Sequence, residues 1–140
     1  MDEIKIANMT ALELSAQYAS RMLSPVTVTE AMLTRIDQIN PKINAFHHVT
    51  TDSALKAARE ADKRWKSGNP LSVIDGVPTA IKDGLLMKGV PVYRGSAANA
   101  AESQEWNVDA PVVSRLQDNG AVILGKTTMC DYGMLASGYS

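Results

Sequence analysis

The sequence has a single cysteine, Cys130, so no disulfide bond can form within the chain. No apolar stretch approaches the roughly 18–20 residues that span a bilayer, and the N-terminus, MDEIKIANMT, lacks the basic region and apolar core of a secretion signal. The 14 basic and 15 acidic residues form no long run of either sign, which argues against a nucleic-acid or membrane surface. These absences favour a cytoplasmic globular protein that binds neither nucleic acid nor membrane.

The first half of the sequence predicts helices. Thr10 followed three residues later by Glu13 is typical of a capping box, in which each residue satisfies a free N–H of the other at a helix start. Thr27 and Glu30 repeat this pattern and predict the start of a second helix. That helix is expected to end before Asn40–Pro41, because the residue before a proline disfavours helical geometry.

The sequence next predicts a third helix and two strands. The helix is predicted from residue 51 or 52 through Trp65, with Gly68 in the left-handed conformation that often follows a last turn. The short apolar runs Val77–Ile81 and Ala121–Leu124 predict buried strands. Alternating helices and strands favour an α/β fold with parallel pairing.

The segments between and after these strands carry weaker signals. Residues 84–107 are rich in Gly, Ala, Ser and Asn and are expected to form a loop. Asp109 is a candidate N-cap for a helix that ends at Gly120. Thr127 or Thr128 is a candidate cap for a short helix through Met134.

Residues Gly120–Thr127, GAVILGKT, match the phosphate-loop pattern G-x-x-x-x-G-K-[ST]. That motif works as a flexible loop whose backbone N–H groups surround phosphates. Here the four residues between the glycines have strand composition, and a helix is expected before Gly120 in place of a strand. A phosphate-loop nucleotide-binding domain stays open as an alternative, decided by whether residues 121–124 form a strand or a loop.

Lys82 follows the first predicted strand and precedes Asp83. One interpretation is an exposed lysine at a strand end, or an ion-pair partner of Asp83. The other is a general base, which requires burial that lowers the pKa of the amine. Local sequence alone leaves both interpretations open.

Two blocks of sequence, in the same order and with the same spacing, resemble the amidase signature family. They comprise residues 76–83 (GVPTAIKD) with 89–91 and 95–96, and then residues 109–116 (DAPVVSRL), 120–127 and 129–134. Residues 40–46 (NPKINAF) and the helices before them are also similar. The resemblance spans nearly the whole chain.

The resemblance implies that residues 1–140 are the N-terminal part of a single amidase-signature domain. Residues 1–70 would be largely helical, and residues 71–140 would begin a mixed or parallel sheet covered by helices. The implied activity is hydrolysis of linear amides by a Ser–cisSer–Lys triad, without a metal or an organic cofactor. Lys82 occupies the position of the catalytic lysine, and Met134 lies in the segment that lines the acyl pocket, where we expect it to contact a small-molecule amide.

The two serines of such a triad lie in later Gly/Ser-rich segments. Ser137 and Ser140 lack the Gly-Gly-Ser setting that those roles require. We therefore expect the 140-residue chain to be inactive alone, and to associate with the missing C-terminal part of the same enzyme or with a second copy as a homodimer. A non-catalytic interaction module derived from an amidase is a further alternative.

Some positions depart from the family pattern. Val92 and Tyr93 stand where Thr-Thr is frequent, and Thr128 stands where Asn is frequent. These departures make the glutamine-transamidating branch a less favoured assignment. They leave Lys82 intact, and they do not distinguish among arylamides, aliphatic amides, ureido acids and peptide amides as substrates.

Other conspicuous residues are interpreted structurally. His47 and His48 are adjacent, so they point in different directions and make a poor metal pair. Cys130 is expected to be a packed free thiol. Trp65 and Trp106 are expected to be packing residues.

Overall fold

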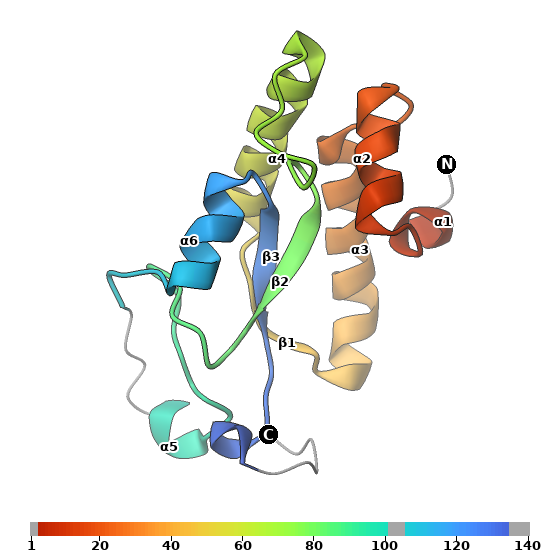
Figure 1. Ribbon diagram of the computed structural model, residues 1–140. Helices are drawn as coiled ribbons and strands as arrows, with labels where there is room; N and C mark the ends of the chain where they lie inside the picture. Colours follow the sequence, from red (N-terminus) through yellow and green to blue (C-terminus); the bar gives the residue numbers. More distant parts are fainter. Residues whose placement is uncertain (1–2, 101–105, 135–140) are drawn as a thin grey trace.

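Figure 1 shows the computed structural model, which describes residues 3–100 and 106–134. A small sheet lies between helices on both sides. In chain order the elements are α1 (Glu3–Ala7), α2 (Ala11–Ala19), α3 (Pro25–Ile43), β1 (Phe46–Val49), α4 (Thr51–Ser67), β2 (Pro78–Lys82), α5 (Ala97–Ala100), α6 (Pro111–Asp118), β3 (Val122–Thr127) and the 3₁₀ turn η1 (Asp131–Gly133).

Side chains fix the starts of α2 and α3. The predicted capping box is confirmed at α2, where Thr10 Oγ1 accepts from Glu13 N at 3.2 Å and Glu13 Oε2 accepts from Thr10 N at 2.7 Å. The capping box predicted at Thr27 is wrong, because α3 starts earlier. Ser24 is the N-cap and accepts from Thr27 N, and Pro25 is the first helical residue, where its missing N–H has no consequence.

The ends of α3 and α4 differ in how well the sequence predicted them. α3 runs past Pro41 to Asn44, a left-handed C-cap with φ 48°, so the predicted end before Pro41 is wrong. The Asn40 side chain bonds both backbone groups of Phe46, and the chain turns directly into β1, a strand that was not predicted. α4 matches the predicted helix, and Gly68 follows it with φ 76° as expected.

The sheet has the order β1-β3-β2. The strands predicted at 77–81 and 121–124 are confirmed as β2 and β3, and they pair in parallel, with Lys82 opposite Thr127. β1 pairs antiparallel with β3, so the sheet is mixed. Residues 122–127 form this central strand, and residues 122–126 are buried. The phosphate-loop alternative is therefore wrong, because a buried strand cannot wrap phosphates.

Apolar residues pack on both faces of the sheet. Val122 and Leu124 of β3 contact Ala54 and Ala58 of α4 and apolar side chains of α3. Ile123 points to the opposite face, where the cluster includes Ile81, Met87, Val90 and Val113. A third cluster joins α1, α2 and α3 around Tyr18. Two parallel strands are thereby held rigidly, and their carboxyl ends meet at one edge.

Two smaller predictions near the C-terminus are corrected. α6 begins after Ala110 without a side-chain cap, and Asp109 instead accepts from Lys88 N at 2.7 Å. The predicted cap at residue 127 or 128 is wrong, since β3 extends to 127 and the Thr128 hydroxyl donates to Asn44 O at 2.8 Å. This contact joins the end of β3 to the end of α3.

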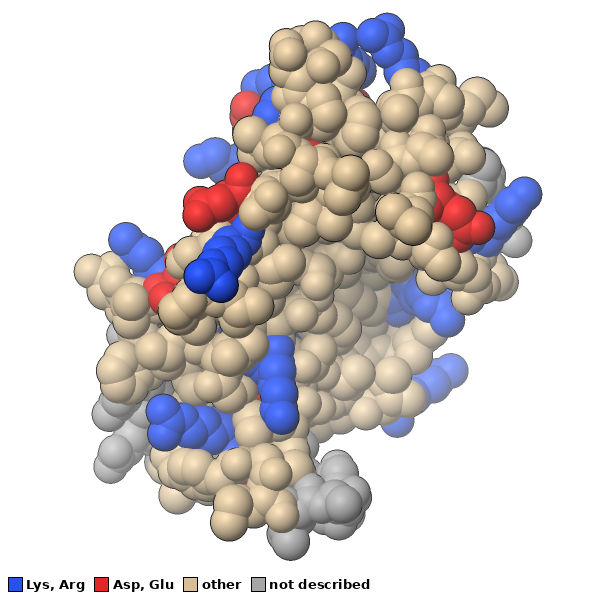
Figure 2. All heavy atoms as spheres, in the orientation of Figure 1, with Lys and Arg blue, Asp and Glu red and all other residues tan. Residues whose placement is uncertain are grey.

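On the face shown in Figure 2, basic and acidic side chains are interspersed over a largely uncharged surface. Among the helices of residues 3–100 and 106–134, none combines the length and the apolar character needed to cross a membrane.

Candidate active site

Lys82 is the last residue of β2. Ile81 before it is 2% exposed and points into the core, and because side chains alternate along a strand, Lys82 points the other way and is exposed. Its amine lies beside Gly133, with Nζ 3.9 Å from the position that a Cβ on that glycine would occupy. Asp83 N donates to Thr127 O at 3.1 Å, so the pairing with β3 continues past Lys82.

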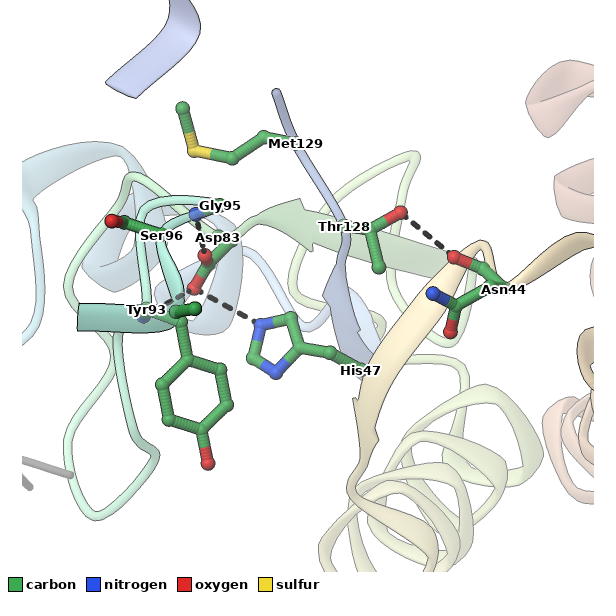
Figure 3. A pocket seen from close by; sticks show the side chains of 9 residues that line it. Asn44, His47, Asp83, Tyr93, Gly95, Ser96, Thr128 and Met129 are labelled. Atoms are coloured by element: carbon green, nitrogen blue, oxygen red, sulfur yellow. Dashed lines mark hydrogen bonds and ion pairs between the residues drawn. The ribbon is translucent and has the colours of Figure 1, made fainter. Parts of the chain in front are cut away.

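Asp83 is buried and contacts groups other than the Lys82 amine. Its side chain is 2% exposed. Oδ1 accepts from Tyr93 N and Oδ2 accepts from Gly95 N, each at 3.0 Å (Figure 3). One carboxylate therefore holds the backbone of the 93–95 loop against the end of β2. The ionic contacts of Asp83 in the described chain are with His47 and Lys126.

Lys126 is completely buried beneath the turn that follows β2, at residues 83–85. Its Nζ donates to Asp83 O at 2.7 Å and to Leu85 O at 2.6 Å, and it lies 3.6 Å from Asp83 Oδ1. Burial lowers the pKa of the Lys126 ammonium, and the Asp83 carboxylate partly opposes that shift. The lysine that completes the apparent phosphate loop is thus an internal cation whose acceptors are protein oxygens.

His47 approaches the same carboxylate from β1. Its Nε2 lies 3.0 Å from Asp83 Oδ1, although the ring is poorly aligned for a hydrogen bond. The ring also packs against Tyr93, with centroids 4.9 Å apart. Burial lowers the pKa of His47, and this effect exceeds the opposing influence of Asp83. His47 Nδ1 is buried without a hydrogen-bond partner among the described residues.

A pocket of about 220 Å³ adjoins this cluster (Figure 3). It is lined by Asn44, His47, Asp83, Tyr93, Gly95, Ser96, Ala97, Thr128 and Met129. Lys82 is not part of this lining. Met129 connects the two regions, because it lines the pocket and its Cε lies 3.4 Å from the Cβ position of Gly133, beside the Lys82 amine.

The structure places the residues singled out from the sequence as follows. Met134 directly follows η1 and is 83% exposed, and it does not line the pocket. Cys130 is a partly buried free thiol. Trp65 packs against Tyr18 and donates to Asp75 O, whereas Trp106 is 38% exposed. Over residues 3–100 and 106–134, no group of three or more His, Cys, Asp or Glu side chains could hold a metal ion.

The fold and these blocks of sequence define a member of the amidase family. The family model described as Amidase matches residues 27–140, and the chain belongs to this family. Its fold is that of the amidase signature enzymes. A bacterial aryl acylamidase of the amidase signature family superposes with a TM-score of 0.83 at 26% identity, covering 93% of this chain and 27% of that one.

Two further relatives are similar to this chain over most of its length. The peptide amidase of Stenotrophomonas maltophilia superposes with a TM-score of 0.78 at 32% identity, covering 90% of this chain and 26% of that one. One glutamyl-tRNA(Gln) amidotransferase subunit of Salinispora tropica is 41% identical over 134 residues, which is 94% of this chain. The chain spans 26% of that relative's length. The departures at Val92, Tyr93 and Thr128 therefore do not separate the chain from the transamidating branch.

Proposed function

We propose that the protein carrying this chain hydrolyses the C–N bond of linear amides, with Lys82 as the general base of a Ser–cisSer–Lys triad. The observation that supports this most is the position of the Lys82 amine. It projects from the end of a rigid parallel strand pair, while the carboxylate beside it in sequence is occupied by Tyr93 N and Gly95 N. The alternative ion pair with Asp83 is absent.

In the proposed mechanism the neutral Lys82 amine accepts a proton. Acting through the serine on the cis peptide bond, it would take the proton of the nucleophilic serine, whose oxygen attacks the amide carbon. The C–N bond of the tetrahedral intermediate then breaks, and the same proton goes to the leaving amine. Water hydrolyses the acyl-serine in a second cycle. Both serines would come from segments outside this chain, so we propose that the 140 residues alone are inactive.

The position of Met134 is compatible with substrate contact. It is exposed directly after Gly133, the residue beside the Lys82 amine. We propose that it contacts the acyl part of the amide once the remainder of the enzyme closes the site. Truncation to Ala should then change KM among acyl chains of different size more than it changes kcat.

A second candidate function is amide transfer. It is favoured by the 41% identity to a glutamyl-tRNA(Gln) amidotransferase subunit. The same Lys82 chemistry would release the nitrogen of an amide, but that nitrogen would pass to an acceptor, and the protein would act together with other subunits. Ammonia release by the purified full-length protein alone, at a rate unchanged by an acceptor, would favour the hydrolase.

The test of the general base compares Lys82→Arg with Lys82→Ala in the full-length protein. Arg keeps the positive charge but cannot deprotonate, because its pKa stays above about 12. Both variants are expected to lose roughly 10²-fold or more in kcat, the lower end of what a positioned acid–base group contributes. Lys88→Ala, which removes an exposed lysine of the following loop, should leave kcat unchanged.

The outcome that would contradict the proposal is specific. An Arg variant that is folded by its melting profile and lies within about tenfold of the parent enzyme would exclude the general-base role. A full-length protein that hydrolyses no member of a panel of aryl, alkyl and peptide amides would favour the non-catalytic interaction module.

A further inference from the structure

The buried lysine of the GKT segment has no role in the triad. We propose that Lys126 is a positioning residue for Lys82, which holds the turn after β2 and the neighbouring 93–95 loop in the geometry that presents the Lys82 amine. This inference rests on the proposed function, since it assigns Lys126 to the support of the same site.

The first support is the place of Lys126 in the sheet. It lies on β3 opposite Ile81, one residue before the partner of Lys82. From there its side chain passes beneath the turn and its ammonium donates to the carbonyls of residues 83 and 85. Leu85 N donates to Lys82 O at 3.0 Å, so the same turn is closed on its other side by a backbone bond. The cation thus fixes the direction of the chain directly after Lys82.

The second support is the link from Lys126 to the far side of the Lys82 amine. Lys126 lies 3.6 Å from the Asp83 carboxylate, which accepts from the backbone N–H groups of Tyr93 and Gly95. Between these two residues, Arg94 O accepts from Tyr132 N at 2.8 Å. Tyr132 precedes Gly133, beside which the Lys82 amine lies. One buried ion pair therefore connects the turn that carries Lys82 to the segment that the amine faces.

Because this ion pair is buried, the loss of either charge would cost free energy. Lys126 is 0% and Asp83 is 1% exposed, so each charge depends on the other and on the polar groups around it. An ammonium has three N–H donors, and the two carbonyls and the carboxylate offer three directions for them. Removing the ammonium would leave two carbonyls without their donor and one carboxylate without its cation.

This arrangement predicts an electrostatic effect on Lys82 as well as a geometric one. If Lys126 loses its charge, the Asp83 carboxylate next to Lys82 in the chain is no longer compensated. An uncompensated negative charge favours the protonated amine and so raises the pKa of a neighbouring lysine. A base that must be neutral then becomes active only at higher pH. Loss of packing alone would not produce this shift.

The experiment uses Lys126→Met and Lys126→Arg in the full-length protein. Met has a similar length without charge, and we expect kcat to fall by about tenfold or more, with KM changed by less than about threefold. The acid limb of its pH–kcat profile should move to higher pH. Arg keeps the charge and can donate to two carbonyls, so it should restore the limb to the parent position and recover most of kcat. Lys88→Met is the matched control and should change neither quantity.

A second readout does not depend on turnover. The rate at which acetic anhydride acetylates Lys82, followed by peptide mass spectrometry across pH, reports the titration of its amine. This profile should shift to higher pH in Lys126→Met and stay in place in Lys126→Arg. If Lys82→Ala retains activity while Lys126→Met still shifts the profile, the proposed function fails and the positioning role stands.

Three results would overturn the positioning role. The first is a folded Lys126→Met protein with parent kcat and an unchanged acetylation profile. The second is a loss of melting temperature and kcat without any shift of the acid limb, which would make Lys126 a packing residue only. The third concerns the case in which Lys126→Met does not fold. In that case, a Lys126→Arg protein whose pH–kcat profile has a shifted acid limb would overturn the positioning role.

Discussion

Arg64 on α4 and Asp75, in the segment that enters β2, form an ion pair through two hydrogen bonds. Arg64 Nε donates to Asp75 Oδ2 at 2.8 Å, and Nη2 donates to Oδ1 at 2.7 Å. The Asp75 side chain is completely buried, and its carboxylate also accepts from Leu71 N. Its hydrogen bonds raise the pKa of the Arg64 guanidinium further above its usual value. The pair attaches α4 to the chain that leads to Lys82.

Arg64→Ala should therefore destabilise the protein strongly. It leaves the Asp75 carboxylate buried without its cation, and breaking such a pair costs about 3 kcal/mol or more in the free energy of unfolding. Urea unfolding measures this loss. Lys63→Ala is the control on the neighbouring residue, whose partner Glu60 is exposed, and no measurable change is expected there. Equal losses in the two variants would contradict a structural role specific to Arg64.

Much of the fold was readable from local patterns. Thr10 and Glu13, Gly68, and the two parallel strands all behave as their sequences predict, because each signal is contained in a few adjacent residues. β1 was missed, since FHHV is four residues long with two histidines and shows no alternation of apolar and polar side chains. The start of α3 was misplaced because Thr27 and Glu30 imitate a capping box inside a helix that Ser24 caps.

The site was predictable only in part. Family resemblance pointed to Lys82, and the structure places it at a strand end as expected. The cluster around Asp83 was not predicted, because His47, Lys126 and the 93–95 backbone come from distant parts of the sequence. The available signal was a lysine inside an otherwise apolar strand, which has to find oxygen acceptors if it is buried.

Gly95→Ala should disturb the site far more than Gly89→Ala. Both glycines have positive φ, 68° and 71°, so alanine is strained at either position, by about 1–2 kcal/mol. Only at Gly95 is there also no space, since a Cβ would lie 2.2 Å from Met129 O, whereas nothing lies within 4 Å at Gly89. Gly95→Ala must push the loop away from Met129 and, under the proposed function, should lower kcat of the full-length protein. Melting curves and kcat that are the same in both variants would show that the close approach is unimportant.

Nucleotides should not bind to residues 120–127. The backbone of residues 122–127 is paired in β3, and the Lys126 ammonium already donates to Asp83 O and Leu85 O. No N–H cradle is left for phosphate. Calorimetric titration with ATP or GTP and magnesium at millimolar concentration is expected to give only heats of dilution. Saturable binding that Lys126→Ala abolishes would contradict this assignment of the strand.

His47 should make the stability of the protein dependent on pH. Burial lowers the pKa of His47 in the folded state, Lys126 and His48 lower it further, and Asp83 opposes them. In the unfolded chain the pKa of a histidine is about 6.5. Below that pH the unfolded state binds the proton more readily, so the free energy of unfolding falls as pH decreases. The stabilising contribution is complete above about pH 6.5 and is lost as pH falls towards the folded-state pKa.

The measurement compares urea unfolding at pH 7.5 and pH 5.5, about one unit on either side of the unfolded-state pKa. His47→Phe retains an aromatic ring beside Tyr93 and removes the titrating group, so the difference between the two pH values should shrink. His48→Phe is the control on the adjacent residue, which makes no contact with the Asp83 carboxylate in the described structure. It removes only the smallest of the influences that lower the pKa of His47, so it should keep most of the parent difference. A His47→Phe protein that loses as much stability on acidification as the parent would show that other groups carry the pH dependence. Since the His47 ring is 3.0 Å from the carboxylate that holds the 93–95 loop, its protonation would also alter the balance of charge around Asp83 and Lys126.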